Sequence, residues 1–376
     1  MRRAAVICEF NPFHNGHKFL IENIKSEFAD EVICIMSGGF VQRGDIAITD
    51  KFARTDAALQ NGADMVVELP TVYAMASAQI FAQNGVRLAR ELGCDTLCFG
   101  AENSINELYS ALDALDCDEI QSKIASLMHE GAYYPHALSD AVGEPHAAVI
   151  SQPNNILALE YIRACRSCDI KPVAVPRAGV SHDSEILSSN IASASKIRSM
   201  ILTGEDYISY TPMRIEHPAT LTGIESALLY RLKTISATEL SGIADVSEGL
   251  ENRIIEIAKH YNSISEILES LKTKRYTRAR LRRILLSALL NITREMQSTP
   301  VPYIRVLGVK VDKKHLITSE HLPLIVDVRR GYDALNISEK EIFKIDLRAT
   351  ELNNIASGII KNEFTQGIIK ASSTLS

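Results

Sequence analysis

The first strand, turn and helix of the chain constrain its fold more than any other feature. Ala4–Phe10 is a short apolar run of the kind that forms a buried strand. Asn11-Pro12 ends it, because proline has no N–H and restricts the residue before it. From Lys18 onward, apolar residues recur at helical spacing. His14 and His17 therefore stand three apart at a turn-to-helix junction and point to the same side.

This junction has the features of a phosphate site. Gly16 leaves room for a ligand to approach the backbone, and the free amides at the positive end of a helix attract anions. Paired imidazoles there suit the charge that develops on a transferring phosphoryl group. We interpret the segment as a nucleotide α-phosphate site of the His-x-Gly-His type, with His14 and His17 as its catalytic residues. The spacing alone also fits two surface histidines beside a tight turn, and the strand–turn–helix context favours the functional interpretation.

Strands and helices alternate up to about residue 100. Strands are predicted at Glu31–Met36, Asp64–Leu69 and Asp95–Phe99, and helices at Asp50–Asn61 and Met75–Leu92. Short apolar strands that alternate with amphipathic helices form βαβ units with right-handed crossovers. The sequence therefore predicts an α/β fold with a Rossmann-like, doubly wound parallel sheet, whose ligands bind beyond the carboxyl ends of the strands.

The distinctive polar and glycine clusters fall at those carboxyl ends. They are His14–His17, Ser37-Gly38-Gly39 and Gly100-Ala101-Glu102, and each follows a predicted strand. Further along, Pro153-Asn154-Asn155 opens a helix. One asparagine is expected to cap that helix, which leaves the other side chain to meet a ligand.

Two later segments offer phosphate contacts, each with a plainer alternative. A fifth strand, Pro172–Pro176, ends in Arg177, which either contacts phosphate or substrate or is solvated. The next helix opens with Ser193 and Ser195 and carries Arg198 in its first turn, a combination that would hold a β- or γ-phosphate. The alternative, which this stretch by itself favours, is that a serine caps the helix and the basic side chains are solvated.

The composition is that of a soluble globular protein, with 376 residues of which 46% are apolar and 23% charged. Seven cysteines, an odd number scattered through apolar segments, indicate reduced thiols in a cytoplasmic protein rather than a disulfide framework. Cys165-x-x-Cys168 lacks the second pair that would accompany it in a zinc site. No Gly-x-Gly-x-x-Gly motif follows the first strand and no Walker A loop occurs, which disfavours dinucleotide redox chemistry and kinase-type NTPases.

The character of the chain changes beyond about residue 210, where helical patterns dominate. We therefore divide the chain into a nucleotide-binding domain, residues 1–208, and a helix-rich domain, residues 209–376. Helices are predicted at Gly223–Thr234, Leu250–His260, Ser263–Leu271 and from Thr277, followed by a small αβ element with strands at Tyr303–Val309 and Leu322–Asp327.

A basic stretch in the second domain contrasts with the net charge of −6 of the whole chain. Arg275, Arg278 and Arg282 are expected on one helical face, opposite a buried stripe. Such a face, with Lys274 beside it, is a candidate site for the phosphate backbone of a nucleic acid, although a run of charge is also typical of a solvated surface. The buried stripe is predicted to consist of Leu281, Ile284, Leu285 and Ala288.

Together these motifs resemble those of the bacterial tRNA(Met) cytidine acetate ligases, a family within the His-x-Gly-His nucleotidyltransferases. The resemblance covers most of the chain, and its motifs occur in order. They are Glu9–His17, Met36–Asp45, Asp50–Arg54, Gly62–Asp64 with Glu68–Pro70, Phe99–Glu102, Pro153–Leu157, Arg177, Ala192–Ser195 with Ile197-Arg198, and Lys274–Arg280. The chain departs from the family in having Ala101 and Ser181 where serine and tyrosine are usual.

The resemblance implies an ATP-dependent ligase of the HUP-type nucleotidyltransferase fold. It would use acetate to form N4-acetylcytidine at the wobble base of elongator tRNA(Met). ATP would be held by the first strand–helix turn together with Gly100, Asn154 and Arg177. The residues of that turn are Ile7, Cys8, Glu9, Phe10, Asn11, Pro12, Phe13, His14, Asn15, Gly16, His17, Lys18, Phe19 and Leu20.

The expected chemistry has two steps and needs no metal site in the protein. Acetate attacks the α-phosphorus of ATP beside His14 and His17, while Mg²⁺ is shared among the phosphates. Ser195 and Arg198 would steady the departing pyrophosphate. The amine of a splayed-out cytosine then attacks the acetyl group. The side chains expected to position the tRNA backbone are Lys274, Arg275, Arg278 and Arg282.

Two rival interpretations remain open at this stage. One is an adenylyltransferase that joins AMP to a small phosphorylated metabolite. The other is an RNA-binding relative that keeps the fold without catalysis, against which the intact His14, Gly16 and His17 count.

Overall fold

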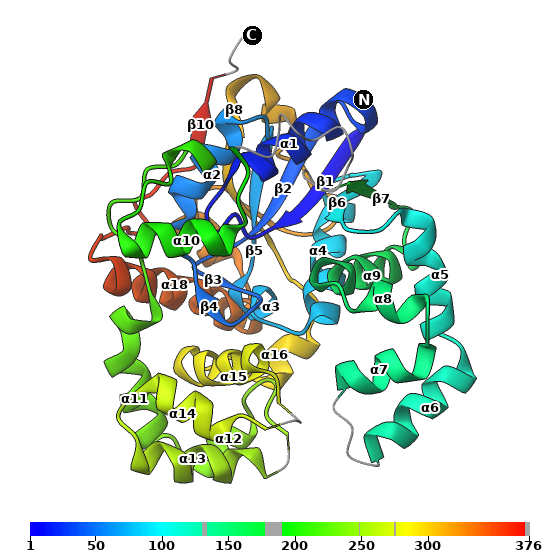
Figure 1. Ribbon diagram of the computed structural model, residues 1–376. Helices are drawn as coiled ribbons and strands as arrows, with labels where there is room; N and C mark the ends of the chain where they lie inside the picture. The colour runs from blue at the N-terminus through cyan, green and yellow to red at the C-terminus, as the bar shows by residue number, and fades with distance from the viewer. Residues whose placement is uncertain (130–133, 177–189, 248, 274–275, 373–376) are drawn as a thin grey trace.

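One sheet lies at the centre of the molecule, with helices on both faces (Figure 1). The middle one of its first five strands, which are all parallel, is β1 (Arg3–Cys8), which pairs with β2 (Glu31–Ser37) on one side and β6 (Thr96–Ala101) on the other. β5 (Met65–Leu69) continues the parallel sheet beyond β2, and β7 (Lys171–Pro176) continues it beyond β6. The strand order therefore reverses at β1, where open α/β sheets bind ligands, and the predicted parallel sheet is confirmed. This computed structural model describes residues 1–129, 134–176, 190–247, 249–273 and 276–372.

Alternate side chains of the strands contribute to two hydrophobic cores, one on each face of the sheet. Ile7 belongs to the core that includes side chains of α4 and α9, and Val6 to the core that includes side chains of α1 and α2. A parallel sheet covered on both faces requires nearly continuous apolar strands, which is why these strands can be recognised as short apolar runs. The four helices are α1 (Asn15–Asn23), α2 (Lys51–Gln60), α4 (Ala78–Glu91) and α9 (Pro153–Cys165).

The C-terminal part of the chain completes the central sheet, whereas the sequence suggested a small αβ element after the helices. β8 (Ile304–Lys310) pairs antiparallel with β5, β10 (Ile369–Ala371) lies parallel to β8, and β9 (Leu324–Ile325) pairs with the start of β8. β8 is apolar and buried over most of its length, so it is stabilised by neighbours on both sides. The division at residues 208 and 209 stays a prediction, and three strands of its second part, β8, β9 and β10, belong to the same sheet as β1.

The helices of the second half lie below the sheet in Figure 1, on the side of the carboxyl ends of the parallel strands. The predicted buried stripe on α15 (Arg278–Leu290) is confirmed, since Leu281, Ile284, Leu285 and Ala288 are all at most 1% exposed. Thr277 caps this helix, which begins at Arg278, and Arg275 lies outside the described residues. Similarly, Ser77 caps α4, so the helix predicted from Met75 begins at Ala78.

Further elements surround this framework. Short 3₁₀ or π-helical turns occur at Ile24–Phe28, Ile208–Tyr210, Leu221–Ile224 and Val311–Leu316. The short strands and the other helices are β3 (Phe40–Val41), β4 (Asp45–Ile46), α3 (Thr71–Ala74), α5 (Ile105–Leu115), α6 (Asp118–His129), α7 (Tyr134–Val142), α8 (His146–Ile150), α10 (Ala194–Thr203), α11 (Glu225–Thr234), α12 (Ala237–Ser241), α13 (Leu250–His260), α14 (Ile264–Leu271), α16 (Arg294–Ser298), α17 (Val328–Ala334) and α18 (Ile337–Ser357).

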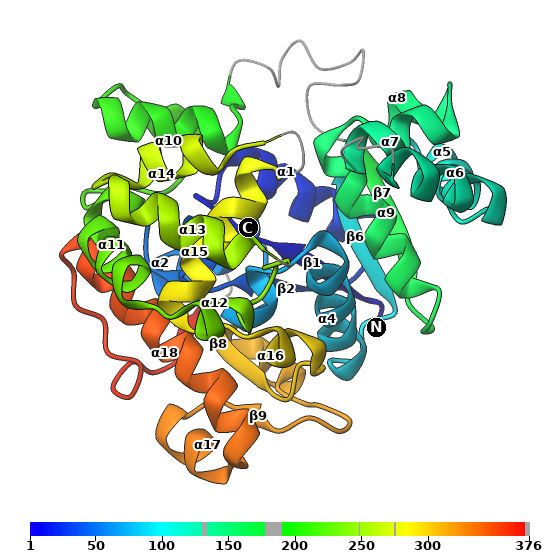
Figure 2. The same ribbon diagram turned by 90° about the horizontal axis from the view of Figure 1, so that it is seen from below.

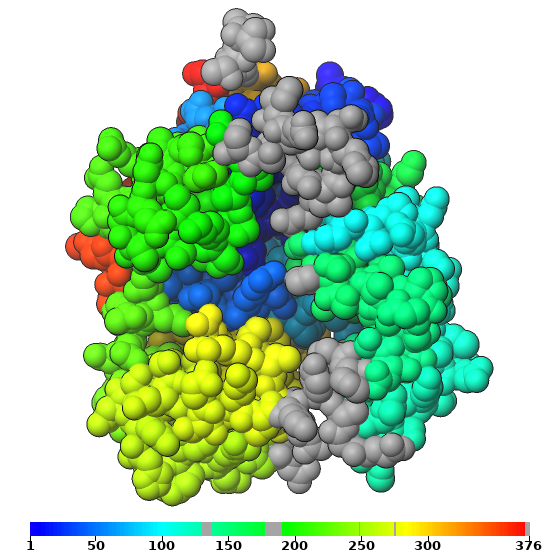
Figure 3. Space-filling view, viewed as in Figure 1, coloured from blue at the N-terminus to red at the C-terminus, as the bar shows by residue number. Residues whose placement is uncertain are grey.

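Two groups of helices flank the first strand and helix when the molecule is seen from below (Figure 2). α10 to α15 lie on one side, and α5 to α8 lie on the other. Between them the surface is hollowed, and N-terminal residues lie at the bottom of the hollow (Figure 3). Within the described ranges, no helix is long and apolar enough to cross a membrane.

Candidate functional site

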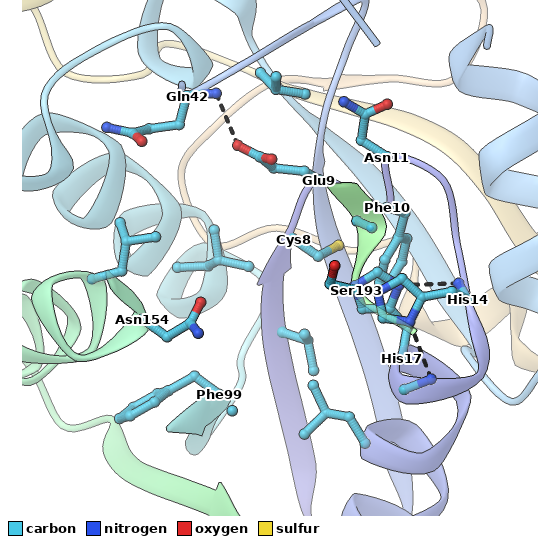
Figure 4. A pocket seen from close by; sticks show the side chains of 18 of the residues that line it. Cys8, Glu9, Phe10, Asn11, His14, His17, Gln42, Phe99, Asn154 and Ser193 are labelled. Atoms are coloured by element: carbon cyan, nitrogen blue, oxygen red, sulfur yellow. Dashed lines mark hydrogen bonds between the residues drawn. The ribbon is translucent and has the colours of Figure 1, made fainter. Parts of the chain in front are cut away.

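A cavity of about 840 Å³ lies at the carboxyl ends of β1 and β6. Its walls are the N-terminus of α1, the β3–β4 hairpin and the starts of α9 and α10 (Figure 4). Both its size and its place at the reversal of strand order are typical of small-molecule sites.

The turn after β1 forms the first wall. Phe10 adopts a left-handed backbone conformation, with φ of 48°, and so bends the chain sharply at the end of the strand. That conformation costs a non-glycine residue about 1–2 kcal/mol, which the surrounding packing has to offset. The ring of Phe10 lies 4.9 Å from that of the buried Phe13 and 4.8 Å from that of His17, measured between centroids. Aromatic packing therefore fixes the turn that carries the histidines.

Backbone hydrogen bonds hold His14 and His17 face to face. His14 caps α1, because its Nδ1 accepts the N–H of Gly16 at 3.1 Å, and the Nδ1 of His17 accepts the N–H of His14 at 3.2 Å. The two rings stack with their centroids 3.7 Å apart. Since each Nδ1 accepts a hydrogen bond, a neutral imidazole at either position carries its proton on Nε2. Both rings are then N–H donors of the kind that bind phosphate oxygens.

A buried arginine holds the ends of β1 and β2 together beneath this wall. Arg54 is fully buried on α2 and donates to the carbonyl oxygens of Glu9 at 2.7 Å, Ser37 at 3.0 Å and Thr49 at 3.2 Å, and also to that of Gly38. Burial lowers the pKa of Arg54 to about 10, which leaves it charged at neutral pH. The sequence motif Asp50–Arg54 contains this residue, but sequence reasoning assigned it no role.

The opposite wall comes from β6 and α9. Asn154 lines the cavity and donates to Oε1 of Glu102, which follows β6. Asn155 is fully buried and donates to Oδ1 of Asn103 and to a backbone carbonyl of α8. The expected asparagine cap is wrong: Gln152 occupies the cap position, and proline follows it at the first helical position, where its missing N–H costs nothing. One asparagine is nevertheless structural, while the other faces the cavity.

The start of α10 contributes a third group of residues. Ser193 caps this helix by accepting the N–H of Lys196 at 3.2 Å, so the cap interpretation holds for Ser193. Ser195 and Arg198 also line the cavity, and Nη2 of Arg198 donates to Oγ of Ser195 at 3.2 Å. Nη1 of Arg198 donates to the carbonyl of Asn11 at 2.7 Å, which ties α10 to the histidine turn.

The β3–β4 hairpin was not predicted to take part in the site. Oε1 of Glu9 accepts the N–H of Gln42 at 2.9 Å, and Asp45 pairs with Arg282 of α15 at 3.3 Å. Gly44 has φ of 71°, and a Cβ there would stand 2.7 Å from Cβ of Arg282. This glycine lets the hairpin lie directly against α15. Burial raises the pKa of Asp45, against the lowering effect of Arg282.

Of the basic residues predicted to bind tRNA, one lines the cavity and another lies on the exposed surface. Arg282 lines the cavity and pairs with Asp45, whereas Arg278 is exposed and pairs with Glu269 at 2.8 Å. Lys274 and Arg275 lie outside the described residues.

Most residues expected to hold ATP meet at the cavity, together with the two proposed pyrophosphate contacts. Of the exceptions, Phe13 is buried, Asn15 donates to two backbone carbonyls, Lys18 is exposed and Pro12 does not line the cavity. Arg177 and Ser181 lie outside the described residues. The predicted residues that line the cavity are Ile7, Cys8, Glu9, Phe10, Asn11, His14, Gly16, His17, Phe19, Leu20, Gly100, Asn154, Ser195 and Arg198. The polar lining residues without a predicted role are Gln42, Arg43, Asp45 and Glu102.

The part of the chain that the structure describes holds no group of three or more His, Cys, Asp or Glu side chains suited to a metal ion. All seven cysteines are free thiols, and Cys165 and Cys168 lie at the C-terminal end of α9 with no metal-binding partners among those residues.

Comparisons with known proteins agree on one family. The model of the HIGH Nucleotidyl Transferase family matches residues 1–366. A tRNA(Met) cytidine acetate ligase of Lysinibacillus sphaericus is 34% identical, with 95% of each chain covered, and one of Listeria monocytogenes is 36% identical, with 96% of each covered. The crystal structure of Thermotoga maritima TmcAL bound with alpha-thio ATP superposes with a TM-score of 0.89 at 26% identity, over 99% of this chain and 100% of that one.

Proposed function

The chain belongs to the HIGH nucleotidyl transferases and, among them, to the tRNA(Met) cytidine acetate ligases, and from this premise we propose that it joins acetate to a cytidine of tRNA(Met) at the expense of ATP. One observation carries the assignment to this cavity. The stacked pair His14 and His17 caps a helix N-terminus at the reversal of strand order. That arrangement suits an α-phosphate, and the Thermotoga relative of the same fold was crystallised with an ATP analogue.

In the first step, acetate attacks the α-phosphorus of ATP and pyrophosphate leaves. The Nε2–H groups of His14 and His17 and the amides at the start of α1 stabilise the charge on the phosphoryl oxygens. Ser195 and Arg198, which line the cavity beyond the turn, contact the departing pyrophosphate. The phosphates of ATP would carry Mg²⁺, which would offset part of their negative charge.

Adenosine lies against the opposite wall, beside Gly100 and Asn154. The side chains of Phe99 and Leu157 line the cavity there and offer an apolar surface for the base. Arg177 lies outside the described residues, and its role in holding ATP is proposed from the family resemblance. ATP therefore spans the cavity from the β6 wall to the histidine turn.

In the second step, the N4 amine of the wobble cytidine of elongator tRNA(Met) attacks the acetyl carbonyl of the bound adenylate, and AMP leaves. A base of the anticodon loop can enter such a cavity because it is single-stranded. The tRNA backbone is positioned by Lys274, Arg275, Arg278 and Arg282, and the reaction takes place in the cytoplasm.

The experiment that tests this function uses the purified protein with ATP, Mg²⁺ and ¹⁴C-acetate, with and without bulk bacterial tRNA. Label recovered from digested tRNA as N4-acetylcytidine is the expected result. Transfer of AMP to a small phosphate ester without any need for acetate would instead establish an adenylyltransferase. If the protein consumed no ATP under either condition, the interpretation as an RNA-binding protein without catalytic activity would hold.

A further inference from the structure

The second step of the proposed reaction requires a proton acceptor. When the cytosine amine attacks the acetyl carbonyl, its nitrogen gains a bond and must lose a proton before a stable amide forms. The histidines are poorly placed to take it, because each Nδ1 already accepts a backbone N–H. Their Nε2 atoms then carry protons in the neutral form and act as donors.

Among the described residues that line the cavity, the carboxylates are those of Glu9, Asp45 and Glu102. Asp45 is paired with Arg282 at 3.3 Å, and Glu102 accepts the amide of Asn154 on the proposed adenosine wall. Glu9 takes part in none of the ion pairs found among the described residues. Glu102 likewise forms no ion pair there, and its Oε2 has no hydrogen-bond partner among those residues, but it stands on the proposed adenosine wall beside Asn154. Glu9 differs from Glu102 in its place, because its carboxylate faces the β3–β4 hairpin.

Hydrogen bonds to both its backbone and its side chain fix the position of Glu9. Its carbonyl oxygen accepts from Arg54 at 2.7 Å, and its Oε1 accepts from the backbone N–H of Gln42 at 2.9 Å. The left-handed conformation of Phe10 turns the chain immediately after it. In Figure 4 the carboxyl group points toward Gln42 and away from the rings of His14 and His17. It thus stands on the side of the cavity formed by the hairpin and not by the phosphate turn.

The surroundings of Glu9 favour proton uptake. Burial raises the pKa of Glu9 above its ordinary value, although Arg43, Arg198 and Arg54 act in the opposite direction. A carboxylate with a raised pKa is a stronger base than one in water.

We propose that Glu9 is the general base of acetyl transfer and that the β3–β4 hairpin beside it forms the pocket for the acceptor cytosine. This inference rests on the proposed function. The C–N bond forms as the amine attacks, the C–O bond to the adenylate breaks, and AMP leaves with the electron pair. The amine proton passes to the Glu9 carboxylate and then to water. Acetyl-adenylate formation needs no such proton transfer, because acetate attacks as an anion.

The test compares the two half-reactions in the full-length wild-type protein and in Glu9→Gln. The first is acetate-dependent exchange of pyrophosphate into ATP. The second is single-turnover transfer of acetyl from preformed, enzyme-bound adenylate to tRNA. Glu9→Gln is expected to slow transfer about 100-fold or more, the usual size of general-base effects, and to slow exchange by a much smaller factor. Glu9→Asp, which keeps a carboxylate, is expected to restore part of the transfer rate.

A pH profile separates a base from a merely structural carboxylate. The base must be ionised, so transfer by the wild type rises with pH through the pKa of Glu9 and then levels off, whereas Glu9→Gln lacks that rise. Equal loss of both half-reactions, or an unchanged profile in Glu9→Gln, would overturn the inference. Transfer by Glu9→Gln at the wild-type rate would also overturn the inference, and the phosphate of the adenylate would then be the proton acceptor. If the wild type itself shows no acetate-dependent exchange, the proposed function fails first and the inference falls with it.

Discussion

Two walls of the cavity, the histidine turn and the β3–β4 hairpin, are built in different ways. The histidine wall consists of consecutive residues, Phe10 to His17, and the hydrogen bonds that orient its two imidazoles span two or three positions in the sequence. Longer-range hydrogen bonds, such as that from Arg198 to Asn11, also tie this turn to the rest of the chain. The hairpin wall joins Gln42 to Glu9 across 33 positions and Asp45 to Arg282 across 237 positions. The two imidazoles are therefore oriented by local hydrogen bonds, whereas the hairpin wall exists only once the fold has closed. In the proposed reaction, the histidine wall serves the activation of acetate, and the hairpin wall binds the acceptor cytosine.

Removing a histidine tests the first wall alone, and the effect is expected to be the largest. His17→Ala deletes one Nε2–H donor and the acceptor that holds the N–H of His14. Acetate-dependent pyrophosphate exchange should fall below detection, which means a loss of about 10²–10³-fold or more, as for other removed transition-state donors. Affinity for tRNA, measured by filter binding, should stay near that of the wild type, because the hairpin wall is untouched.

A matched control is His315→Ala, which removes a half-exposed histidine paired with Glu31 far from the cavity. It should exchange pyrophosphate at the wild-type rate. Normal exchange by His17→Ala would show that the stacked pair is not catalytic, and lost tRNA binding in that variant would show that the two walls are not independent.

Arg54 joins the two walls, so its loss should damage the whole site. Arg54→Ala leaves four buried carbonyl oxygens without their donor, including that of Glu9. The expected loss of unfolding free energy is about 3 kcal/mol, measured by urea denaturation, with both half-reactions slowed. Arg90→Ala, an exposed position on α4, serves as the control and should change stability by less than about 0.5 kcal/mol. A stable Arg54→Ala with one impaired half-reaction would show that this arginine serves a single wall.

The difference between the two walls also explains which parts of the site could be predicted from the sequence. The strand Ala4–Phe10, the Asn11-Pro12 break and the histidines lie within one short window, so periodicity and turn chemistry are enough to predict that wall. Asp45 and Arg282 lie too far apart in the sequence for periodicity or turn chemistry to predict that they form a pair. A basic run such as Arg278–Arg283 has no partners in its own neighbourhood, so the sequence could not show that Arg282 turns into the cavity while Arg278 pairs with Glu269.

The same reasoning applies to the sheet and to the asparagines of α9. β8 is as apolar as the other strands, but nothing near it in the sequence shows that it would pair with β5. At Pro153, two local rules compete, because asparagine favours the cap and proline favours the first helical position. In the structure Pro153 occupies the first helical position, and Gln152 caps the helix without a side-chain hydrogen bond.

Gly44 provides a way to disturb the hairpin wall while leaving the histidines in place. Gly44→Ala adds a Cβ at 2.7 Å from both Cβ of Arg282 and the backbone N of Arg283, at a residue with positive φ. The hairpin must then move away from α15, at an expected cost of about 2 kcal/mol in unfolding free energy. Acetyl transfer to tRNA should slow about tenfold, while pyrophosphate exchange stays within about twofold, if local hydrogen bonds suffice to orient the two imidazoles. Slowing of exchange to the same degree would contradict the separation of the two walls.

The smallest effect is expected at the rim of the hairpin wall. Arg278→Glu with Arg282→Glu reverses two charges, of which Arg278 is exposed and Arg282 is paired with Asp45. If these side chains contact the phosphates of tRNA, the dissociation constant should rise about tenfold at low salt, and the slope of log K against log salt should flatten by about two. Pyrophosphate exchange tests for collateral damage and should change little. Arg329→Glu with Arg330→Glu, on the exposed surface of α17, changes the net charge by the same amount and should leave tRNA affinity nearly unchanged. Equal weakening in both double variants would mean that the effect is one of net charge, and the basic residues of α15 would then be a solvated surface with no specific role in binding tRNA.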